Sequence, residues 1–192
     1  MTWPRHGIAS AGVDAPQRNV ELKAFDPDPE GTLARALALG AREEGLLIQR
    51  DTYFHAGRGR LKLREEEPGS AHLIGYTRSD EDPDVRVSEY RIAPVSDPEA
   101  VRDVLEASLG VRVVVEKRRR LLLWRSVRIH LDEVSGLGTF LELEAVAPAG
   151  SDLAREWALV AHLREVLAIT DDRLRDGSYS DALLRVSRAA PA

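Results

Sequence analysis

A chain of 192 residues suits one domain, and a hydrophobic fraction of 43% suffices for a core despite a charged fraction of 31%. The formal net charge of −5 excludes a global basic field for nucleic acid, and an aromatic fraction of 5% argues against a stacking surface for single strands. The lack of cysteine excludes disulfides, thiolate metal sites and cysteine nucleophiles. No apolar run approaches the roughly 18 residues of a membrane helix. No signal-peptide pattern is present either, so we expect a soluble cytoplasmic protein.

The two ends of the chain lack hydrophobic periodicity, whereas the region between them is patterned throughout. We therefore expect a disordered leader over residues 1–18, one ordered domain over residues 19–186 and a disordered tail over residues 187–192.

The stretch NVELKAFD opens the ordered domain with the period of a strand. Val20 and Leu22 share one side of it, and the opposite side carries polar residues. Those polar residues are Asn19, Glu21 and Lys23. The pattern predicts a half-buried strand whose polar face holds both an acid and a base.

Strand patterns dominate the rest of the domain. The predicted strands cover residues 19–25, 46–55, 60–65, 71–78, 85–92, 111–125, 126–134 and 139–146. The predicted helices are the segment that starts near Asp28 or Glu30, a helix capped by Asp97 that ends at Gly110, residues 152–167 and residues 180–186. Short turns favour antiparallel pairing, so eight such strands form either an open sheet or a closed barrel.

Nearly every predicted strand has one apolar face and one charged or polar face. The charged and polar positions are Glu21, Lys23, Arg60, Lys62, Arg64, Tyr76, Arg78, Arg86, Ser88, Tyr90, Lys117, Arg119, Arg128, His130, Asp132, Glu142 and Glu144. On a single strand this pattern is typical of a solvated face. Cations gather on the middle strands and carboxylates on the first, seventh and eighth. The joint pattern favours a barrel with these side chains inside and helices against its apolar outer face.

Charges of both signs inside a barrel are costly unless a ligand compensates them. Arg and Lys suit phosphate oxygens, and Mg²⁺ and Mn²⁺ prefer oxygens of carboxylates, water and phosphate. Glu142 and Glu144 are two residues apart on one strand and project from the same face, where Glu21 can complete a metal site. The interior therefore indicates a phosphate chain with a bound divalent metal.

Six motifs follow one another along the chain: VELK, QRDTYF, LKLRE, EKRRRLLLW, HLDEVSGLGTFLELE and SYSDALL. Their residues and their order resemble the CYTH superfamily, also called triphosphate tunnel metalloenzymes. That superfamily includes class IV adenylyl cyclases, thiamine triphosphatases and inorganic tripolyphosphatases. The resemblance covers residues 19–186, and the segment from His130 to Glu144 is its most specific part.

The resemblance implies an α+β fold: an eight-stranded antiparallel β-barrel, the triphosphate tunnel, with helices packed on the outside. It implies phosphate contacts from Lys62, Arg64, Arg78, Arg86, Lys117 and Arg119. It implies metal ligands at Glu21, Asp132, Glu142 and Glu144, and catalytic roles for Lys23 and Asp132. Asn19 stands where the family signature has Glu. This change keeps an oxygen ligand but loses a charge, so metal affinity should fall.

The resemblance implies a divalent-metal-dependent enzyme, best read as a cyclase that converts ATP to cyclic AMP and pyrophosphate. QRDTYF and HLDEVSGLG favour that branch. Hydrolysis of tripolyphosphate, thiamine triphosphate or a nucleoside triphosphate is the alternative, because the same residues grip any triphosphate. A non-catalytic triphosphate or polyphosphate binder would tolerate Asn19, and a plain barrel interaction module is the remaining interpretation. We expect no nucleic-acid or membrane partner; a homodimer fits a family that is often dimeric.

Overall fold

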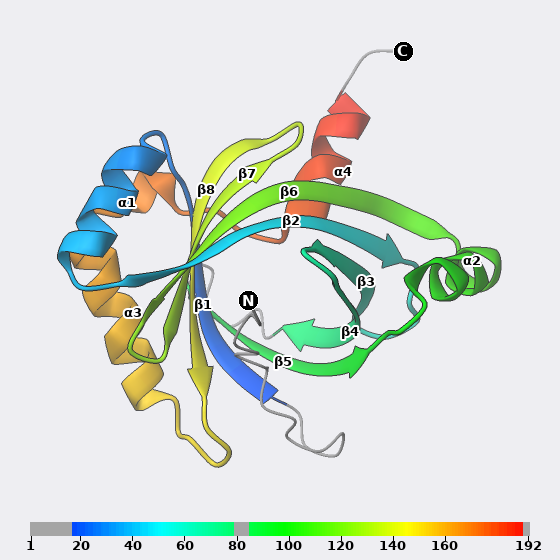
Figure 1. The fold of residues 1–192 in the computed structure, drawn as a ribbon, viewed down its shortest axis with the longest axis horizontal. Helices are drawn as coiled ribbons and strands as arrows, with labels where there is room; N and C mark the ends of the chain where they lie inside the picture. Colours follow the sequence, from blue (N-terminus) through cyan, green and yellow to red (C-terminus); the bar gives the residue numbers. More distant parts are fainter. Residues whose placement is uncertain (1–16, 79–84, 190–192) are drawn as a thin grey trace.

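The computed structural model describes residues 17–78 and 85–189; for Arg78, Val85 and Arg86 it describes the backbone alone. Its eight strands form one closed antiparallel barrel with the order β1-β5-β4-β3-β2-β6-β7-β8 (Figure 1). In chain order the elements are β1 (Gln17–Phe25), α1 (Pro29–Ala38), β2 (Arg42–Phe54), β3 (Arg60–Glu67), β4 (Ser70–Arg78), β5 (Val85–Pro94), α2 (Pro98–Leu109), β6 (Val111–Trp124), β7 (Val127–Val134), β8 (Gly138–Ala147), α3 (Ala154–Val166), the 3₁₀ helix η1 (Asp171–Arg173) and α4 (Tyr179–Ala189). The predicted barrel with external helices is confirmed.

The first strand closes the barrel. One edge of β1 pairs with β8, from Arg18 opposite Ala147 to Phe25 opposite Phe140. Its other edge pairs with β5. Closure satisfies the backbone hydrogen-bonding groups that an open sheet would expose at its edges, and it fixes an inside and an outside for every strand.

Some element boundaries differ from the sequence prediction. β2 begins at Arg42 rather than at residue 46, because its first residues, REEG, lack alternation and pair with β6 alone. β1 already begins at Gln17, within the expected leader, and α4 continues to Ala189, within the expected tail. Residues 1–16, 79–84 and 190–192, which include the rest of both expected disordered ends, lie outside the described residues.

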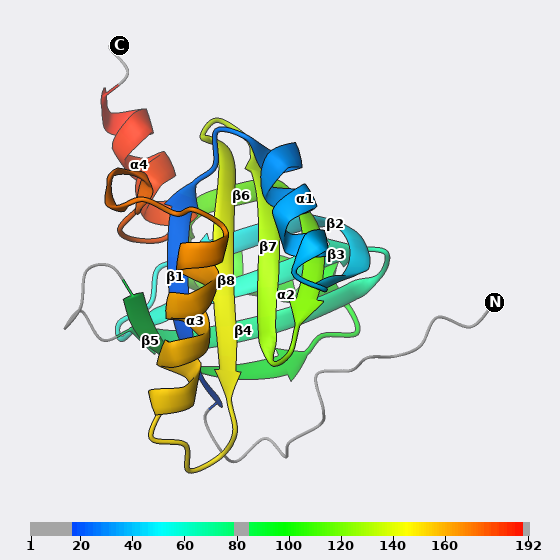
Figure 2. The same ribbon diagram turned by 90° about the vertical axis from the view of Figure 1, so that its left-hand side faces the viewer.

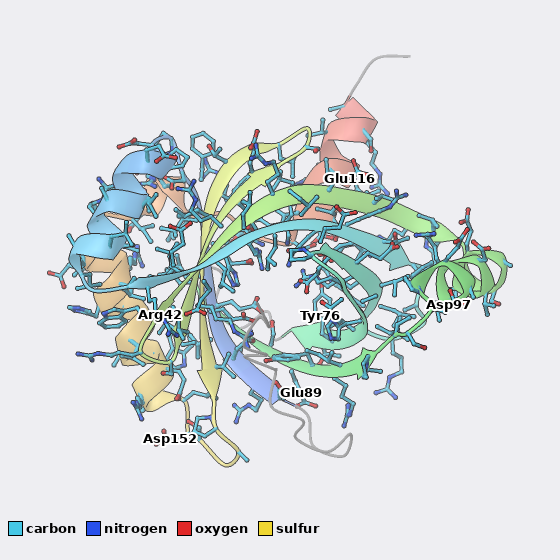
Figure 3. The ribbon with its side chains drawn as sticks, viewed as in Figure 1. Arg42, Tyr76, Glu89, Asp97, Glu116 and Asp152 are labelled. Carbon is cyan, nitrogen blue, oxygen red and sulfur yellow. The ribbon has the colours of Figure 1, made fainter. Side chains whose placement is uncertain are left out.

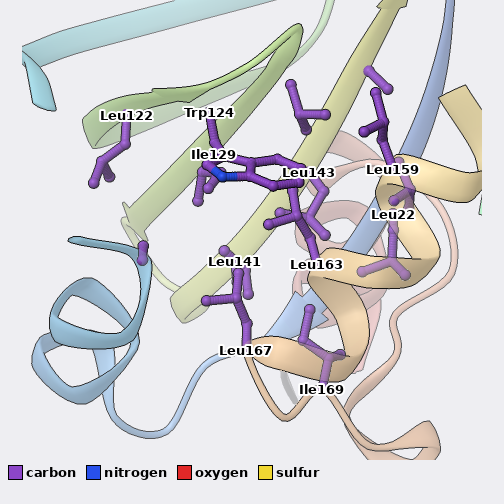
Figure 4. Packing of buried hydrophobic residues seen from close by; sticks show 14 of the residues in the cluster. Leu22, Leu122, Trp124, Ile129, Leu141, Leu143, Leu159, Leu163, Leu167 and Ile169 are labelled. Carbon is purple, nitrogen blue, oxygen red and sulfur yellow. The ribbon is translucent and has the colours of Figure 1, made fainter. Parts of the chain in front are cut away.

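The main hydrophobic core lies outside the barrel, between its wall and helices α1 and α3 (Figure 2). In Figure 4, Leu22, Leu143 and Leu163 meet in this layer, where each is at most 1% exposed. The alternation that buries Leu22 on the outer face of β1 turns Glu21 and Lys23 to the inner face. The helices thus supply the dry core, which leaves the interior of the barrel free for polar side chains.

Aspartates cap two of the helices. The side chain of Asp28 accepts a hydrogen bond from the backbone nitrogen of Gly31, and that of Asp97 accepts one from Ala100, each at 3.0 Å. Gly110 then ends α2 with φ of 73°, a conformation that favours glycine. Within residues 17–78 and 85–189, no helix combines the length and the apolar character that crossing a membrane requires.

Candidate active site

The barrel encloses a cavity of about 160 Å³, lined by side chains from all eight strands and from the start of α4. Figure 3 shows Tyr76 within the ring of strands and Glu116 on its outer side. The predicted site residues that line the cavity are Glu21, Lys23, Lys62, Arg64, Lys117, Arg119, Glu142 and Glu144. The backbones of Arg78 and Arg86 lie in β4 and β5, but their side chains fall outside the described structure.

The acidic side of the cavity lies on the neighbouring strands β1 and β8. Glu21 and Glu144 are directly opposite each other, an arrangement that is destabilising for like charges. The side-chain nitrogen of Asn19 relieves it by donating hydrogen bonds to both, at 3.0 Å to Glu21 and 2.5 Å to Glu144. Arg128 binds the other Glu144 oxygen at 3.1 Å. Burial raises the pKa of Glu144, but Arg128, His130 and Arg119 together outweigh burial and keep the pKa below its ordinary value.

Glu142 connects the acidic side to the basic side. Its Oε1 lies 3.2 Å from Nζ of Lys23, and its Oε2 accepts a hydrogen bond from Nη2 of Arg119 at 2.7 Å. Nδ1 of His130 lies 3.5 Å from the same Oε2. Although burial disfavours ionisation, Lys23 and these other neighbours hold the pKa of Glu142 well below its ordinary value. Glu142 is therefore a carboxylate whose two oxygens are both engaged.

Asp132 lies behind the cavity wall instead of in it. Arg119 donates two hydrogen bonds to it, at 2.7 and 2.5 Å, and the hydroxyl of Tyr179 donates a third at 2.9 Å. Burial raises the pKa of Asp132, but Arg119 and Lys117 lower it to about 2. Both oxygens of Asp132 orient the guanidinium of Arg119, and its role as a metal ligand stays a prediction.

The basic side contains a buried acid that the sequence analysis did not select. Asp51 is 1% exposed and accepts hydrogen bonds from Nζ of Lys62 at 2.9 Å and from Arg64 at 2.7 Å twice. Nζ of Lys117 lies 3.8 Å from it. Burial raises the pKa of Asp51, yet Arg64 and the two lysines bring it well below its ordinary value. Asp51 thus holds together the cations that the sequence predicted to bind phosphate.

Lys117 is a buried lysine whose pKa is lowered. It is 5% exposed, and burial together with the nearby Arg119 lowers its pKa to about 7, against the opposing attraction of Asp132 and Asp51. Arg119 remains charged, since Asp132 and Glu142 keep its pKa above its ordinary value despite burial. The positive charge of Lys117 therefore depends on pH near neutrality.

The side of the cavity that β4 and β5 form carries isoleucine and tyrosine side chains. Ile74 lies directly opposite Ile92, and Tyr76 directly opposite Tyr90, and all four line the cavity. We call these four residues the apolar wall. It borders the basic side, because Lys62 on β3 pairs in register with Ile74.

Asp51 and Tyr179 belong to the site, but the sequence analysis does not select either of them. Asp51 lies within QRDTYF, a motif that was noted but not assigned to the interior. Tyr179 starts α4 and is buried against the cavity, where Nζ of Lys23 lies 4.0 Å from the centre of its ring. The SYSDALL motif was the available signal for Tyr179, since it marked the helix without indicating which residue enters the barrel.

The acidic side has the donor chemistry that a divalent metal requires. Glu21 and Glu144 offer carboxylate oxygens, and Oδ1 of Asn19 is buried beside them without a hydrogen-bond partner. Within the described part of the chain, no three His, Cys, Asp or Glu side chains form a group that could hold a metal ion. The residues fit Mg²⁺ or Mn²⁺, but the nitrogen of Asn19 now bridges the two carboxylates.

A closed antiparallel barrel with helices outside, and with cations and carboxylates paired in its interior, defines the tunnel class of barrel. The chain belongs to the CYTH family, because the CYTH domain model matches residues 17–166. No curated protein sequence matches the chain.

Solved structures share this fold. The PH1012 protein of Pyrococcus horikoshii OT3 is 22% identical with a TM-score of 0.74, over 85% of this chain and 98% of that one. A Vibrio parahaemolyticus protein named a "putative adenylate cyclase" is 20% identical with a TM-score of 0.72, over 88% and 98% of the two chains. HpAC1 of Hippeastrum, named a "putative adenylyl cyclase" with a dominant triphosphatase activity, is 16% identical with a TM-score of 0.63, over 91% and 98%.

Proposed function

We propose that this protein is a divalent-metal-dependent enzyme that binds a triphosphate in its tunnel and converts ATP to cyclic AMP and pyrophosphate. The observation that carries the proposal is the convergence of Lys62, Arg64, Lys117 and Arg119 on one side of a cavity whose other side is acidic. A polyanion complexed with a metal matches that separation of charge.

The chain's own contribution is to position the phosphates and to neutralise them. Arg64 and Lys62 would exchange Asp51 for phosphate oxygens, and Asp132 acts as a positioning residue for Arg119. Lys23, fixed by Glu142, would lie where the two sides meet. Mg²⁺ or Mn²⁺ held by Glu21 and Glu144, with Glu142 and Asn19 beside them, would offset the charge that develops on the phosphate oxygens.

In the proposed cyclisation the ribose hydroxyl oxygen bonds to the α-phosphorus, and the bond from that phosphorus to the bridging oxygen breaks. Pyrophosphate leaves with the bridging oxygen, and the hydroxyl proton passes to a base or to water. In the hydrolysis, water would instead attack the terminal phosphorus, the bond from that phosphorus to its bridging oxygen would break, and phosphate would be released with the diphosphate as leaving group. This hydrolysis is the second candidate, and the activity named for HpAC1 supports it.

The test is to incubate the protein with ATP, tripolyphosphate and thiamine triphosphate, each with Mg²⁺ or Mn²⁺, and to measure cyclic AMP, pyrophosphate and phosphate. Cyclic AMP supports the cyclase, and phosphate without cyclic AMP supports the triphosphatase. Binding without turnover supports a non-catalytic binder. A protein that no triphosphate stabilises against heat would contradict the whole proposal.

The substitution Arg64→Ala is expected to raise the Kd for tripolyphosphate about tenfold, because a hydrogen bond to a charged group contributes about 1.5 kcal/mol or more. The fold should persist, since Lys62 and Lys117 still neutralise Asp51. Arg118→Ala is the matched control, because Arg118 lies on the outer face with its side chain 61% exposed. Calorimetric titration measures the Kd for tripolyphosphate of both variants. An equal loss of affinity in the two variants would contradict an interior phosphate site.

Lys117 should make triphosphate binding dependent on pH. Its pKa of about 7 is lower than the ordinary value of 10.5, so the ammonium is present below pH 7 and is lost as the pH rises through 7. Affinity for tripolyphosphate should accordingly fall between pH 6 and pH 8. Lys117→Arg keeps its charge across this range and should show a shallower decline. Parallel pH profiles for the two proteins would show that Lys117 does not bind the anion.

A further inference from the structure

We propose that tyrosine rings position the lysines that bind the triphosphate, and that Tyr179 is the positioning residue for both Lys23 and Lys117. The inference rests on the proposed function and extends it, because it gives a role in phosphate binding to a residue of α4, outside the barrel strands. The rings are a second kind of partner for cations that also contact carboxylates.

Lysine is rare in this chain and occurs only inside the barrel. The sequence contains 24 arginines but three lysines, which are Lys23, Lys62 and Lys117. All three line the cavity, and so do all four tyrosines of the chain. Arginine, in contrast, occurs on both faces of the barrel wall, for example at Arg64 inside and at Arg118 outside. Lysine and tyrosine therefore share one location that the other cationic residues of the chain do not define.

Each lysine ammonium lies over a tyrosine ring. Nζ of Lys23 is 4.0 Å from the centre of the Tyr179 ring, and Nζ of Lys117 is 5.1 Å from the same centre. Nζ of Lys62 is 5.5 Å from the centre of the Tyr53 ring. These distances lie within the range of about 6 Å over which the face of an aromatic ring attracts a cation.

A ring holds an ammonium group differently from a carboxylate. Glu142 and Asp51 carry charges that offset those of Lys23 and Lys62, so a phosphate has to compete with them for the cations. A ring attracts the ammonium through its quadrupole and has no net charge. Lysine has a flexible stem, which a ring contact restricts while the charge remains available to phosphate oxygens.

Tyr179 reaches the lysines because the start of α4 is tied to the strands of the barrel. Nη1 of Arg60 on β3 donates hydrogen bonds to Oγ of Ser178 at 2.6 Å and to Oδ2 of Asp181 at 2.7 Å. Nη2 of Arg112 on β6 lies 3.6 Å from Oδ1 of Asp181. These contacts on both sides of Tyr179 in the sequence fix the point at which its side chain enters the barrel.

The segment that leads into α4 also contacts Lys23 directly. The backbone oxygen of Lys23 accepts a hydrogen bond from the backbone nitrogen of Arg175 at 2.9 Å, and Nζ of Lys23 donates one to the carbonyl of Gly177 at 3.5 Å. The hydroxyl of Tyr179 donates to Asp132. Burial, with the nearby Asp132, raises the pKa of Tyr179 well above its ordinary value, so the phenol stays neutral beneath the lysines.

The arrangement is tested first without any ligand, by NMR of the full-length protein labelled with ¹³C at the lysine ε-carbons. The three lysines give three signals, which the substitutions Lys23→Arg, Lys62→Arg and Lys117→Arg assign. Protons above the face of a ring are shifted upfield, so we expect such shifts for Lys23 and Lys117. Tyr179→Leu should abolish both shifts and spare that of Lys62, whereas Tyr179→Phe should preserve all of them. Val186→Ala, at a 53% exposed position of the same helix, is the control and should change none.

Calorimetric titration with tripolyphosphate then measures the consequence for binding. Tyr179→Leu should raise the Kd about tenfold, because two lysines lose their ring contact, and Tyr179→Phe should raise it less than about threefold. Lys23→Met should raise the Kd by a smaller factor in the Tyr179→Leu background than in the wild type, since Lys23 is no longer held in place there. A role of Tyr179 in stability alone would make the two effects additive.

The results separate this proposal from the proposed function. Lysine signals that Tyr179→Leu leaves unchanged, equal losses of affinity in Tyr179→Leu and Tyr179→Phe, or additive effects of Tyr179→Leu and Lys23→Met would overturn the role of the rings and leave the triphosphate tunnel standing. A wild type that binds no triphosphate would overturn the proposed function, while the lysine signals would still show whether the rings hold the ammonium groups. If Tyr179→Leu does not fold, the wild-type spectrum decides, because signals of Lys23 and Lys117 without upfield shifts would overturn the proposal.

Discussion

Asp51→Asn is expected to lower the free energy of unfolding by about 3–5 kcal/mol and, at the same time, to tighten the binding of tripolyphosphate. Asp51 is a buried counter-ion that lies 2.9 Å from Lys62, 2.7 Å from Arg64 and 3.8 Å from Lys117. The amide removes the negative charge and leaves Lys62, Arg64 and Lys117 without the carboxylate that offsets their mutual repulsion. A bound polyanion would then supply the missing negative charge. Tripolyphosphate should therefore stabilise the variant more than it stabilises the wild type.

The pH dependence of this loss has a definite sign. The pKa of Asp51 is held well below the ordinary value of 3.8, so its stabilising contribution is complete above pH 3.8 and declines as the pH falls towards the folded pKa. The difference in stability between wild type and Asp51→Asn should therefore shrink in acid below about pH 3.8.

Urea unfolding with and without tripolyphosphate measures both effects. Glu116→Gln is the matched control, because Glu116 on β6 forms an outer ion pair with Arg50, 3.8 Å apart, and its side chain is 59% exposed. Removing the charge of Glu116 should change the free energy of unfolding by less than about 0.5 kcal/mol. The stabilisation by tripolyphosphate should stay the same as in the wild type. If Asp51→Asn is as stable as this control, or responds less to tripolyphosphate than the wild type, Asp51 does not compete with phosphate.

The sequence predicted which face of each strand lines the cavity. Side chains alternate between the two faces of a strand, so an apolar face identifies the opposite, polar face as the inner one. β8 is the clearest example: Leu141 and Leu143 are fully buried in the outer core, and Glu142 and Glu144 line the cavity. Whether the sheet closes depends on pairing between the first and last strands, which a local pattern does not contain. The family resemblance supplied that step, and the pairing of β1 with β8 confirms it.

The period of two fails where both faces of a strand are buried. The end of β2 is such a place, since Thr52 and Phe54 are as inaccessible as Asp51 and Tyr53. No contrast between an apolar and a polar face remained there to mark Asp51 as an interior residue. Its importance comes from partners on β3 and β6, which only the assembled barrel brings together.

Orientation toward the interior also does not determine the depth of a side chain. Asp132 has the parity of Arg128 and His130 on β7, so the pattern placed it with the residues of the cavity. In the structure Arg119 and Tyr179 cover it. The covering residues come from β6 and α4, and the entry of a helix end into a barrel leaves no periodic signal in the strands.

Asn19→Asp is expected to raise the affinity for Mn²⁺ about 100-fold. In the wild type the Asn19 nitrogen donates to Glu21 and Glu144 and so takes the place of a cation between them, while its oxygen has no hydrogen-bond partner. Aspartate has the same shape but replaces those donors by a third carboxylate. At a separation of about 4 Å and an effective dielectric constant of 20, one unit charge changes the energy of another by about 4 kcal/mol, part of which is lost to repulsion among the acids.

The same substitution should destabilise the metal-free protein, by about 1–3 kcal/mol, because two hydrogen bonds are lost and three carboxylates are brought together. Mn²⁺ at 100 times its Kd would contribute about 2.7 kcal/mol, which for a chain of this size raises the Tm by roughly 5–10 °C. Thermal unfolding across a Mn²⁺ titration measures both changes without any substrate. Arg18→Glu places an added carboxylate on the exposed side of the same strand and is the control. If Mn²⁺ raises the Tm of Arg18→Glu as much as that of Asn19→Asp, general attraction by the surface charge accounts for the higher Mn²⁺ affinity. Asn19 then does not limit the metal site.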